Sequence, residues 1–241
     1  MLKIDIISVQ PKMFEGFLRE SICARAVKKG ACEINIVDLR EFGLGKWRKV
    51  DDKPYGGGPG MLMRCEPWFG AVESCRTDGA RVVMTSPSGR KFTQRTAEEL
   101  AQSDHLVFMC GHYEGFDARC RTLATDELSI GDFVMTGGEL AAAAMVDAIV
   151  RLLPGVLGGG PAATASESFG QDGLLEAPQY THPPEFRGLK VPEVLLSGDH
   201  RKIEAWKRAE ARKLTQAARP DLLRPVDAVS SPRQKKGAIP A

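Results

Sequence analysis

Three short glycine-rich segments each follow an apolar, β-prone stretch, and they constrain the fold more than any other feature of the chain. The pairs are residues 81–85 with 86–89, residues 106–110 with 111–115, and residues 130–135 with Gly137-Gly138. The last pair opens an alanine-rich segment typical of a helix. In open α/β sheets such loops gather at the carboxyl edge, where backbone groups approach a ligand without a Cβ in the way. The pattern predicts a ligand site built from three loops.

The composition narrows the class of protein. The chain has 241 residues, of which 43% are hydrophobic, and a net charge of +2. No apolar run approaches the ~20 residues that a membrane helix needs, and the first seven residues indicate a strand rather than a signal peptide. The six cysteines form no C-x-x-C motif, so no zinc site is predicted. Neither G-x-G-x-x-G nor G-x-x-x-x-G-K-[ST] occurs, which argues against the usual nucleotide loops. We expect a cytoplasmic protein with another kind of ligand.

Strand-like and helix-like periods alternate through residues 1–157, which predicts an α/β domain. Strands are expected near residues 2–9, 33–38, 81–85, 105–110 and 130–135, and helices near 93–103, 117–123 and 138–153. A helix after Pro11 would place six apolar residues on one side: Met13, Phe14, Phe17, Leu18, Ile22 and Val27. Residues 158–175 have the composition of a flexible linker, so residues 176–241 are predicted to form a second domain.

The predicted second domain is the basic part of the chain. Residues 1–175 contain 20 Lys and Arg against 23 Asp and Glu, whereas residues 176–241 contain 13 against 8. A helix is expected at 199–218, with an apolar stripe formed by Ile203, Trp206, Leu214 and Ala217. Four arginines occupy the opposite side: Arg201, Arg208, Arg212 and Arg219. A solvated cationic face is one interpretation, and contact with nucleic-acid phosphates is the other.

Four further features are ambiguous when each is taken alone. Tyr55-Gly56-Gly57-Gly58-Pro59-Gly60-Met61 is either a mobile surface turn or a slot for a flat base. Glu114 is either an exposed turn residue or a partner for a ligand amine or metal. Arg151 could merely complement a helix dipole, and Glu167 could be a solvated carboxylate of the linker. Their combination is more informative than any one of them.

Five segments, in order along the chain, resemble one family. They are Tyr55-Gly-Gly-Gly-Pro-Gly-Met61, Gly111-His-Tyr-Glu-Gly-Phe-Asp117, Ser129-Ile-Gly-Asp-Phe-Val-Met-Thr-Gly-Gly-Glu-Leu140, Pro154-Gly-Val-Leu-Gly158 and Val194-Leu-Leu-Ser-Gly198. From about residue 1 to 225 the chain resembles the bacterial tRNA (guanine-37-N1)-methyltransferases. The resemblance implies a SPOUT-class α/β fold, in which a parallel sheet ends in a deep trefoil knot, followed by a small, mostly helical C-terminal domain. Pattern alone would predict an unknotted doubly wound sheet.

The resemblance also implies sites for both substrates. The S-adenosylmethionine site would consist of Ser86, Pro87, Ser88, Gly89, Gly111, Tyr113, Glu114, Gly115, Ile130, Gly131, Asp132, Phe133, Val134, Met135, Gly137 and Gly138. With a tRNA substrate, the glycine-rich slot and the arginine side of the 199–218 helix become its expected contacts: Tyr55, Gly56, Gly57, Gly58, Pro59, Met61, Arg201, Arg208, Arg212 and Arg219. A homodimer with a shared active site and an association with magnesium are further implications, although no residue cluster in the sequence indicates a metal site.

The family's catalytic positions fall on Arg151 and Glu167. The family usually has an aspartate before Ser-Phe, and here Glu167 precedes Ser168-Phe169. Guanine N1 carries a proton that a carboxylate must remove during methyl transfer, and an arginine can stabilise the negative charge left on O6. Two alternatives stay open: a knotted methyltransferase that acts on another RNA position, and a non-catalytic RNA-binding protein with the same fold.

Overall fold

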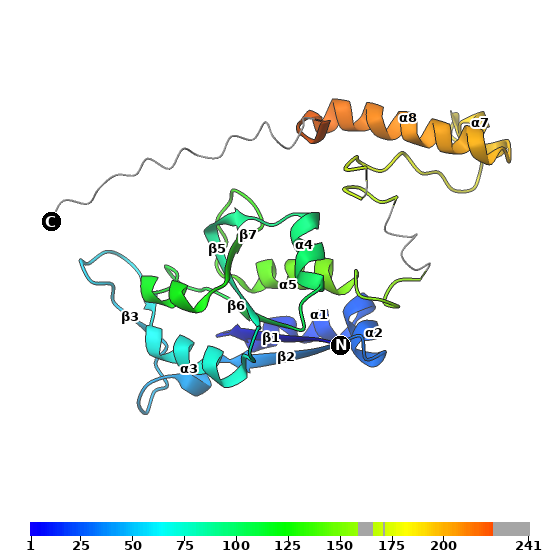
Figure 1. The fold of residues 1–241 in the computed structure, drawn as a ribbon. Coiled ribbons are helices and arrows are strands. Elements are labelled where there is room, and N and C mark those ends of the chain that lie inside the picture. The colour runs from blue at the N-terminus through cyan, green and yellow to red at the C-terminus, as the bar shows by residue number, and fades with distance from the viewer. Residues whose placement is uncertain (159–165, 171, 224–241) are drawn as a thin grey trace. The chain divides into compact units, whose positions relative to one another are not determined.

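The structure is a computed structural model that describes residues 1–158, 166–170 and 172–223. Its internal contacts divide the chain into two compact units, Met1–Pro161 and Ala162–Ala241. The predicted linker at 158–175 lies partly outside the described residues. Figure 1 shows the elements of both units along the chain.

A five-stranded sheet forms the centre of the first unit (Figure 1). Its strands are β1 (Leu2–Ser8), β2 (Cys32–Asp38), β5 (Arg81–Lys91), β6 (His105–Met109) and β7 (Asp126–Ser129). The order is β2-β1-β6-β5-β7, and every neighbouring pair is parallel. The predicted α/β class with a parallel sheet is confirmed.

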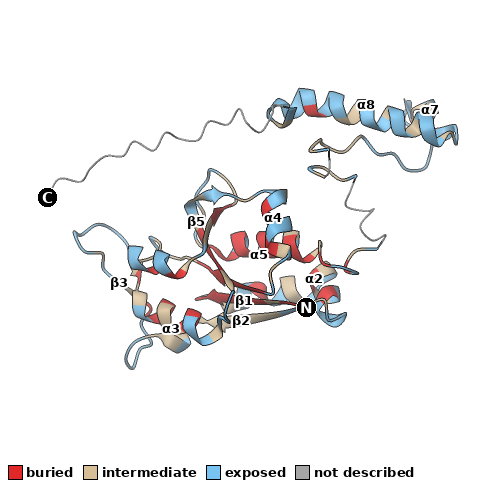
Figure 2. Ribbon diagram, in the orientation of Figure 1, coloured by how far each residue is buried: buried red, intermediate tan, exposed pale blue. Residues whose placement is uncertain are grey.

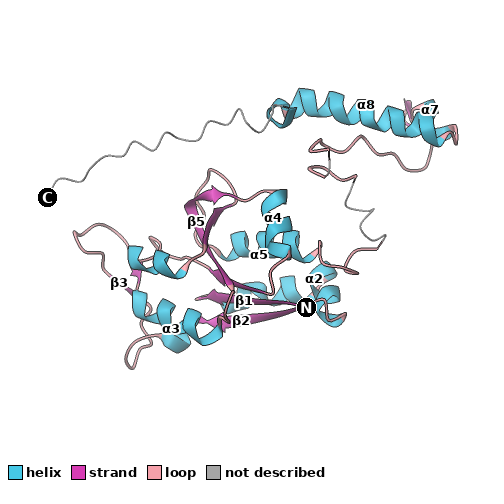
Figure 3. Cartoon of the chain, in the orientation of Figure 1, coloured by secondary structure: helices cyan, strands magenta, loops and turns pink. Residues whose placement is uncertain are grey.

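Helical segments cover both faces of this sheet (Figure 3). One face packs against α1 (Glu15–Arg19), α2 (Ser21–Lys28), α4 (Gln94–Ala101) and α5 (Glu139–Val150), and the other against α3 (Cys65–Cys75) and the 3-10 turns η2 (Leu39–Phe42) and η3 (Ala118–Leu123). Side chains of β6 alternate between the faces, with Leu106 and Phe108 on the first and Val107 and Met109 on the second. Both sides of the sheet are therefore core, as Figure 2 shows.

A buried carboxylate links two strands that are far apart in sequence. Asp5 on β1 is 2% exposed, and its Oδ2 lies 2.7 Å from Nε2 of His105 on β6. Lys3 Nζ lies 3.0 Å from the same oxygen, and Nδ1 of His105 contacts the hydroxyl of Thr77 at 2.9 Å. Buried polar groups need such partners, so this cluster fixes β1 beside β6.

Several predicted boundaries were wrong. The helix expected after Pro11 is divided into η1 (Pro11–Phe14), α1 and α2. The break between α1 and α2 lies where Glu20 is extended and Ser21 takes a positive φ of 55°; Met13 and Val27 are exposed. The helix expected at 117–123 is the 3-10 turn η3. The strand expected at 130–135 is instead β7, and residues 130–138 form a loop in which Phe133 and Val134 are exposed. Helix α5 ends at Val150, three residues early.

The second unit is built around one long helix. It contains the hairpin β8 (Glu185–Phe186) and β9 (Leu189–Lys190), then α7 (Glu193–Leu196), α8 (His200–Ala218) and η4 (Pro220–Leu223). The side chain of Asp199 caps α8 by accepting hydrogen bonds from the backbone of Arg201 and Lys202. Within the unit, the buried Thr215 accepts a hydrogen bond from the Leu175 amide at 2.9 Å. The helix predicted at 199–218 is confirmed.

Candidate active site

A bulge within β5 and the loops that follow β6 and β7 meet around a cavity of about 390 Å³. Because the three strands are adjacent and parallel, their carboxyl ends lie at one edge of the sheet. All but two of the residues predicted for the cofactor line this cavity. The lining residues among them are Ser86, Pro87, Ser88, Gly111, Tyr113, Glu114, Gly115, Ile130, Gly131, Phe133, Val134, Met135, Gly137 and Gly138. The loops singled out in the sequence are thus brought together.

The two exceptions, Gly89 and Asp132, have other surroundings. A Cβ on Gly89 would lie 2.5 Å from the backbone of Glu127, so this glycine permits close packing of β5 on β7. The carboxylate of Asp132 is 92% exposed and lies 3.4 Å from Lys91 Nζ. Neither residue lines the cavity.

The first loop is a bulge inside β5 rather than a turn after it. Thr85 and Arg90 both pair with Leu128 of β7, so residues 86–89 leave the ladder between them. Ser86 and Ser88 on this bulge contact each other through their hydroxyls at 2.8 Å. The prediction that the strand ends at Thr85 was therefore wrong, but residues 86–88 still reach the cavity.

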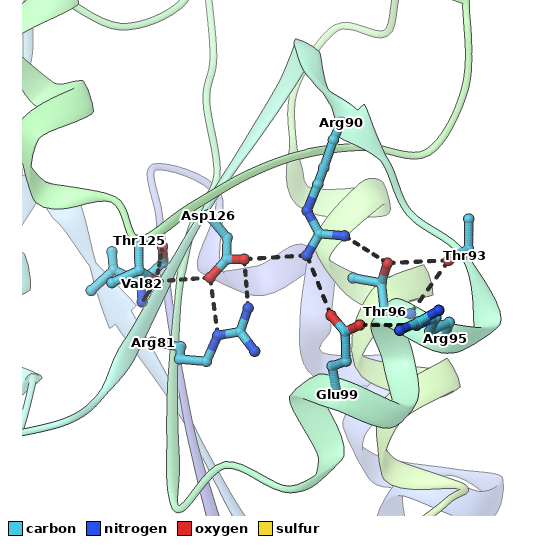
Figure 4. Close-up of polar contacts among 9 residues, drawn as sticks. All are labelled: Arg81, Val82, Arg90, Thr93, Arg95, Thr96, Glu99, Thr125 and Asp126. Atoms are coloured by element: carbon cyan, nitrogen blue, oxygen red, sulfur yellow. Dashed lines mark hydrogen bonds and ion pairs between the residues drawn. The ribbon is translucent and has the colours of Figure 1, made fainter. Parts of the chain in front are cut away.

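One carboxylate joins the strand segments on both sides of the bulge. Figure 4 shows Asp126 between the guanidinium groups of Arg81 and Arg90. Arg81 donates two hydrogen bonds to it, at 3.0 and 2.6 Å, and Arg90 lies at 3.4 Å. Burial opposes the ionisation of Asp126, but the hydrogen bonds from Arg81 and Thr125 outweigh it and lower the pKa of this carboxyl. The ends of the bulge are held by an ionised group.

Helix α4 extends this network, which we call the Asp126 clamp (Arg81, Arg90 and Asp126). Arg90 donates a hydrogen bond to the Thr96 hydroxyl at 3.0 Å and lies 3.7 Å from Glu99 (Figure 4). Glu99 also pairs with Arg95 on the same helix. The bulge is consequently attached both to β7 and to α4.

The second loop, residues 111–115, is fixed by backbone contacts. The amide of Gly138 donates to the Gly111 carbonyl at 2.7 Å, and the amide of Glu114 donates to the Met61 carbonyl at 3.0 Å. Gly60 packs so closely on Glu114 that a Cβ would lie 2.4 Å from Oε1 of that side chain. The predicted base slot therefore adjoins the cavity through Gly60 and Met61, while Tyr55 is fully exposed.

Gly138 is the most tightly packed glycine of the site. A Cβ there would lie 2.0 Å from the Thr85 hydroxyl and 2.9 Å from the Gly111 amide. Thr85 is buried and its hydroxyl donates to the Met109 carbonyl at 3.0 Å. The β5 segment just before the bulge and the other two loops thus meet at this position.

The sequence reasoning missed two carboxylates, of which Glu127 lines the cavity and Glu139 is buried next to the lining residues Gly137 and His112. Glu139 is 2% exposed; it accepts a hydrogen bond from Ser8 at 2.7 Å and its other oxygen lies 3.7 Å from Nδ1 of His112. Its position after the diglycine, in the first turn of α5, was an available signal because helix N-termini favour carboxylates. Glu127 gave no comparable signal.

Glu127 lines the cavity beside Ser88 and Arg121. It accepts a hydrogen bond from Ser88 at 2.7 Å, and Arg121 lies at 3.3 Å. Burial opposes its ionisation, but the hydrogen bonds from Ser88 and Ser86 outweigh burial and lower the pKa of the Glu127 carboxyl. The cavity wall therefore carries an ionised carboxylate that is paired with the Arg121 guanidinium.

The two predicted catalytic residues belong to different units. Arg151 is half-buried and is the C-cap residue of α5, one position beyond the helix in which it was expected. Glu167 is half-buried in the second unit, where it lines a separate cavity of about 970 Å³ together with Glu176, Lys207 and Arg208.

The cations of α8 fall into two groups. Lys202, Lys207 and Lys213 pair with acidic residues three positions earlier, at 3.3 to 3.6 Å. Arg201, Arg208 and Arg212 are exposed and form no ion pair with any described residue. Arg219 differs, because Asp221 binds it at 2.7 Å and its guanidinium lies 5.9 Å from the Phe169 ring. Three of the four predicted phosphate-contacting arginines are thus available to an anion.

The described residues contain no group of three or more His, Cys, Asp or Glu suited to a metal ion. Within the same residues, no helix is both long and apolar enough to cross a membrane.

Comparison with known proteins identifies the family. The profile of the tRNA (guanine-1)-methyltransferase TrmD matches residues 2–225. The tRNA (guanine-N(1)-)-methyltransferase of Geobacillus kaustophilus (strain HTA426) is 52% identical over 225 residues, which cover 92% of this chain and 91% of that protein. The chain belongs to this family.

Two other relatives support membership of the TrmD family. The enzymes of the same name from Dictyoglomus turgidum (strain DSM 6724 / Z-1310) and Anaeromyxobacter sp. (strain Fw109-5) are each 52% identical, over 223 and 224 residues, and the matches cover 92% of this chain and 90% of each relative. The TrmD match extends over parts of both units. The resemblance inferred from five segments is confirmed.

Proposed function

We propose that the protein transfers a methyl group from S-adenosylmethionine to N1 of guanine 37 in tRNA. One observation supports this most strongly: in a chain of the TrmD family, three glycine-rich loops converge on a cavity at the carboxyl edge of a parallel sheet. The site in this proposal is that cavity together with Arg151 and Glu167.

The cavity has the size and chemistry that S-adenosylmethionine requires. Its volume of about 390 Å³ falls within the ~300–1,000 Å³ of ordinary ligand sites. Glu114 and Glu127 line it, and their charge suits the ammonium and sulfonium groups, while apolar residues such as Ile130 and Met135 suit the adenine. When bound, the cofactor supplies a methyl group on a positively charged sulfur.

Two residues of the chain would act on the guanine. Glu167 would accept the N1 proton, because the protonated nitrogen is a poor nucleophile at neutral pH. Arg151 would stabilise the negative charge that proton loss places on O6. These residues lie in different units, and we propose that the site is completed across a homodimer, with Arg151 from one subunit and Glu167 from the other.

Exposed apolar side chains support the dimer. Phe133, Val134 and Leu140 are 55%, 88% and 61% exposed, although the first two also line the cavity. A second copy could cover this apolar surface. The proposal includes the trefoil knot, which would be tied by the segment from β7 through α5; the close approach of Thr85, Gly111 and Gly138 is consistent with such a crossing.

The second unit would hold the tRNA. We assign phosphate contacts to Arg201, Arg208 and Arg212 because they are exposed and have no acidic partner among the described residues. The six cysteines are all free, which supports a cytoplasmic, reducing location. Magnesium would accompany the cofactor carboxylate or the RNA rather than occupy a protein cluster.

Mass-spectrometric mapping tests the proposal. Unmodified tRNA transcripts with guanine or adenine at position 37 are incubated with the protein and S-adenosylmethionine. We expect N1-methylguanine at position 37 of the first transcript and no methyl group in the second. A methyl group elsewhere in the RNA would contradict the assigned position, and no methyl group at all would contradict the activity.

A further inference from the structure

The first unit presents an exposed tryptophan on a tight turn. Trp47 is 79% exposed, within the segment that we call the Trp47 turn (residues 44–49). The other two tryptophans of the chain are more buried, with Trp68 at 0% and Trp206 half-buried. A single exposed apolar residue is ordinary on a protein surface. A functional role for Trp47 therefore has to be argued from the residues around it.

Backbone hydrogen bonds hold this turn in one conformation. Leu44 and Lys49 exchange two bonds, at 2.9 and 3.0 Å, and the Arg48 amide donates to the Gly45 carbonyl at 3.1 Å. Gly43 packs on Arg48 so closely that a Cβ would lie 2.3 Å from its carbonyl oxygen. Val50, which directly follows the turn, is 3% exposed and belongs to the core. The indole is therefore presented from a fixed support.

The turn is also cationic. Lys46, Arg48 and Lys49 are exposed, and none of them pairs with an acidic residue among those that the structure describes. The ammonium of Lys46 lies 5.6 Å from the centre of the Trp47 ring, within the range of a cation–π contact. The nearby acids Asp51 and Asp52 follow in β3 (Asp51–Asp52), and Asp52 is bound by Arg64 at 2.6 Å. The turn is thus a positive, aromatic patch on the less basic part of the chain.

We propose that the Trp47 turn is a second contact for the RNA substrate, in which the indole stacks on an unpaired base and the cations bind the flanking phosphates. This inference rests on the proposed function, since it assumes a tRNA substrate. An exposed aromatic ring beside cations is the arrangement by which proteins bind single-stranded nucleic acid. A second copy of the chain suits the turn less well in a contact centred on it, because on a two-fold axis its three cations would face an identical set.

Three variants test the role of the turn: Trp47→Ala, Trp47→Phe and Lys46→Gln combined with Arg48→Gln. Binding of unmodified tRNA is measured by filter binding at several salt concentrations, and binding of S-adenosylmethionine by calorimetry. We expect Trp47→Ala to raise the Kd for tRNA about 5- to 100-fold and Trp47→Phe to restore most of the affinity. The double cation variant should flatten the slope of log K against log salt by about 0.7 to 0.9 for each lost phosphate contact. The cofactor Kd should stay unchanged in all three.

Two results would overturn the inference. Wild-type affinity of Trp47→Ala for tRNA would show that the indole contacts no base. Conversion of a dimer to a monomer by the same substitution, measured by light scattering, would assign the turn to a subunit interface. Both results are distinct from failure of the proposed function, in which the unaltered protein would itself leave tRNA unmethylated.

Discussion

Replacing Gly138 with alanine should destabilise the first unit by about 3 kcal/mol. The backbone at Gly138 has φ −84° and ψ −5°, which any residue adopts, so the penalty is purely steric. The new Cβ would lie 2.0 Å from the Thr85 hydroxyl and 2.9 Å from the Gly111 amide, whereas ordinary contact begins at 3.4 Å. Overpacking of a buried site costs ~1–3 kcal/mol, and the upper end applies because one neighbour is backbone.

Urea denaturation and thermal unfolding, both without cofactor, measure this effect. About 3 kcal/mol should lower Tm by roughly 6–12 °C in a chain of this size. Removing the closest atom with Thr85→Ala should relieve part of the clash. The double variant should therefore be more stable than the sum of the single effects predicts, by about 1–2 kcal/mol.

Gly16→Ala is the matched control. Gly16 lies within α1, and its added Cβ would meet nothing within 4 Å, so the substitution should be neutral or stabilise by up to about 1 kcal/mol. If Gly138→Ala unfolds at the same urea concentration as the unaltered protein, the close packing of Gly138 on Thr85 and Gly111 is not a property of the native state.

Four further outcomes are expected. Glu167→Gln should leave cofactor binding nearly intact by calorimetry but slow single-turnover methyl transfer about 100-fold or more; near-normal chemistry would exclude Glu167 as the base. Asp126→Asn should lose about 1–3 kcal/mol of stability at neutral pH. Because the pKa of Asp126 is lowered in the folded state, its ionised carboxylate stabilises the fold above the ordinary pKa near ~4. This stabilisation is lost as pH falls through the lower folded pKa, so the denaturation midpoints of the unaltered protein and of Asp126→Asn should converge in acid. Neutralising Arg208 and Arg212 should reduce the slope of log K for tRNA against log salt by about 0.7–0.9 per lost phosphate contact. An unchanged slope would show that the arginine side of α8 is only solvated. Mixed dimers of Arg151→Ala with Glu167→Gln should recover about a quarter of wild-type activity under a shared-site geometry, and verified subunit exchange without activity would refute sharing.

Conservative controls accompany two of these tests. Glu167→Asp keeps a carboxylate and should retain more activity than Glu167→Gln. Lys207→Gln removes a cation that is already paired with Glu204 at 3.3 Å, so it should change the salt dependence less than either arginine substitution.

The sequence predicted the convergence of the loops because that convergence follows from local pattern and sheet geometry. Apolar stretches before glycines predicted the strands, and parallel neighbours must end at the same edge. The strand expected at 130–135 failed because hydrophobicity indicates burial only on average. Phe133 and Val134 are apolar but exposed in a loop, and β7 lies four residues earlier.

Contacts between residues far apart in the sequence could not be predicted from local sequence pattern. Glu139 is buried because it meets Ser8, which is 131 residues away in the chain. The bulge at residues 86–89 depends on the register of β5 against β7, which no local pattern in β5 specifies. The roles of Arg151 and Glu167 came from family resemblance, and they stay predictions.

The position of β1 between β2 and β6 also affects the chain while it is being synthesised. Asp5 and His105 are 100 residues apart, so at ~5–20 residues per second one edge of β1 waits roughly 5–20 s for its partner strand to emerge. An unpaired edge can recruit strands of other nascent chains, and charged side chains oppose such pairing. Lys3 and Asp5 supply charges of both signs on β1. We therefore expect the carboxylate that later joins β1 to β6 to oppose edge pairing of the newly made strand as well.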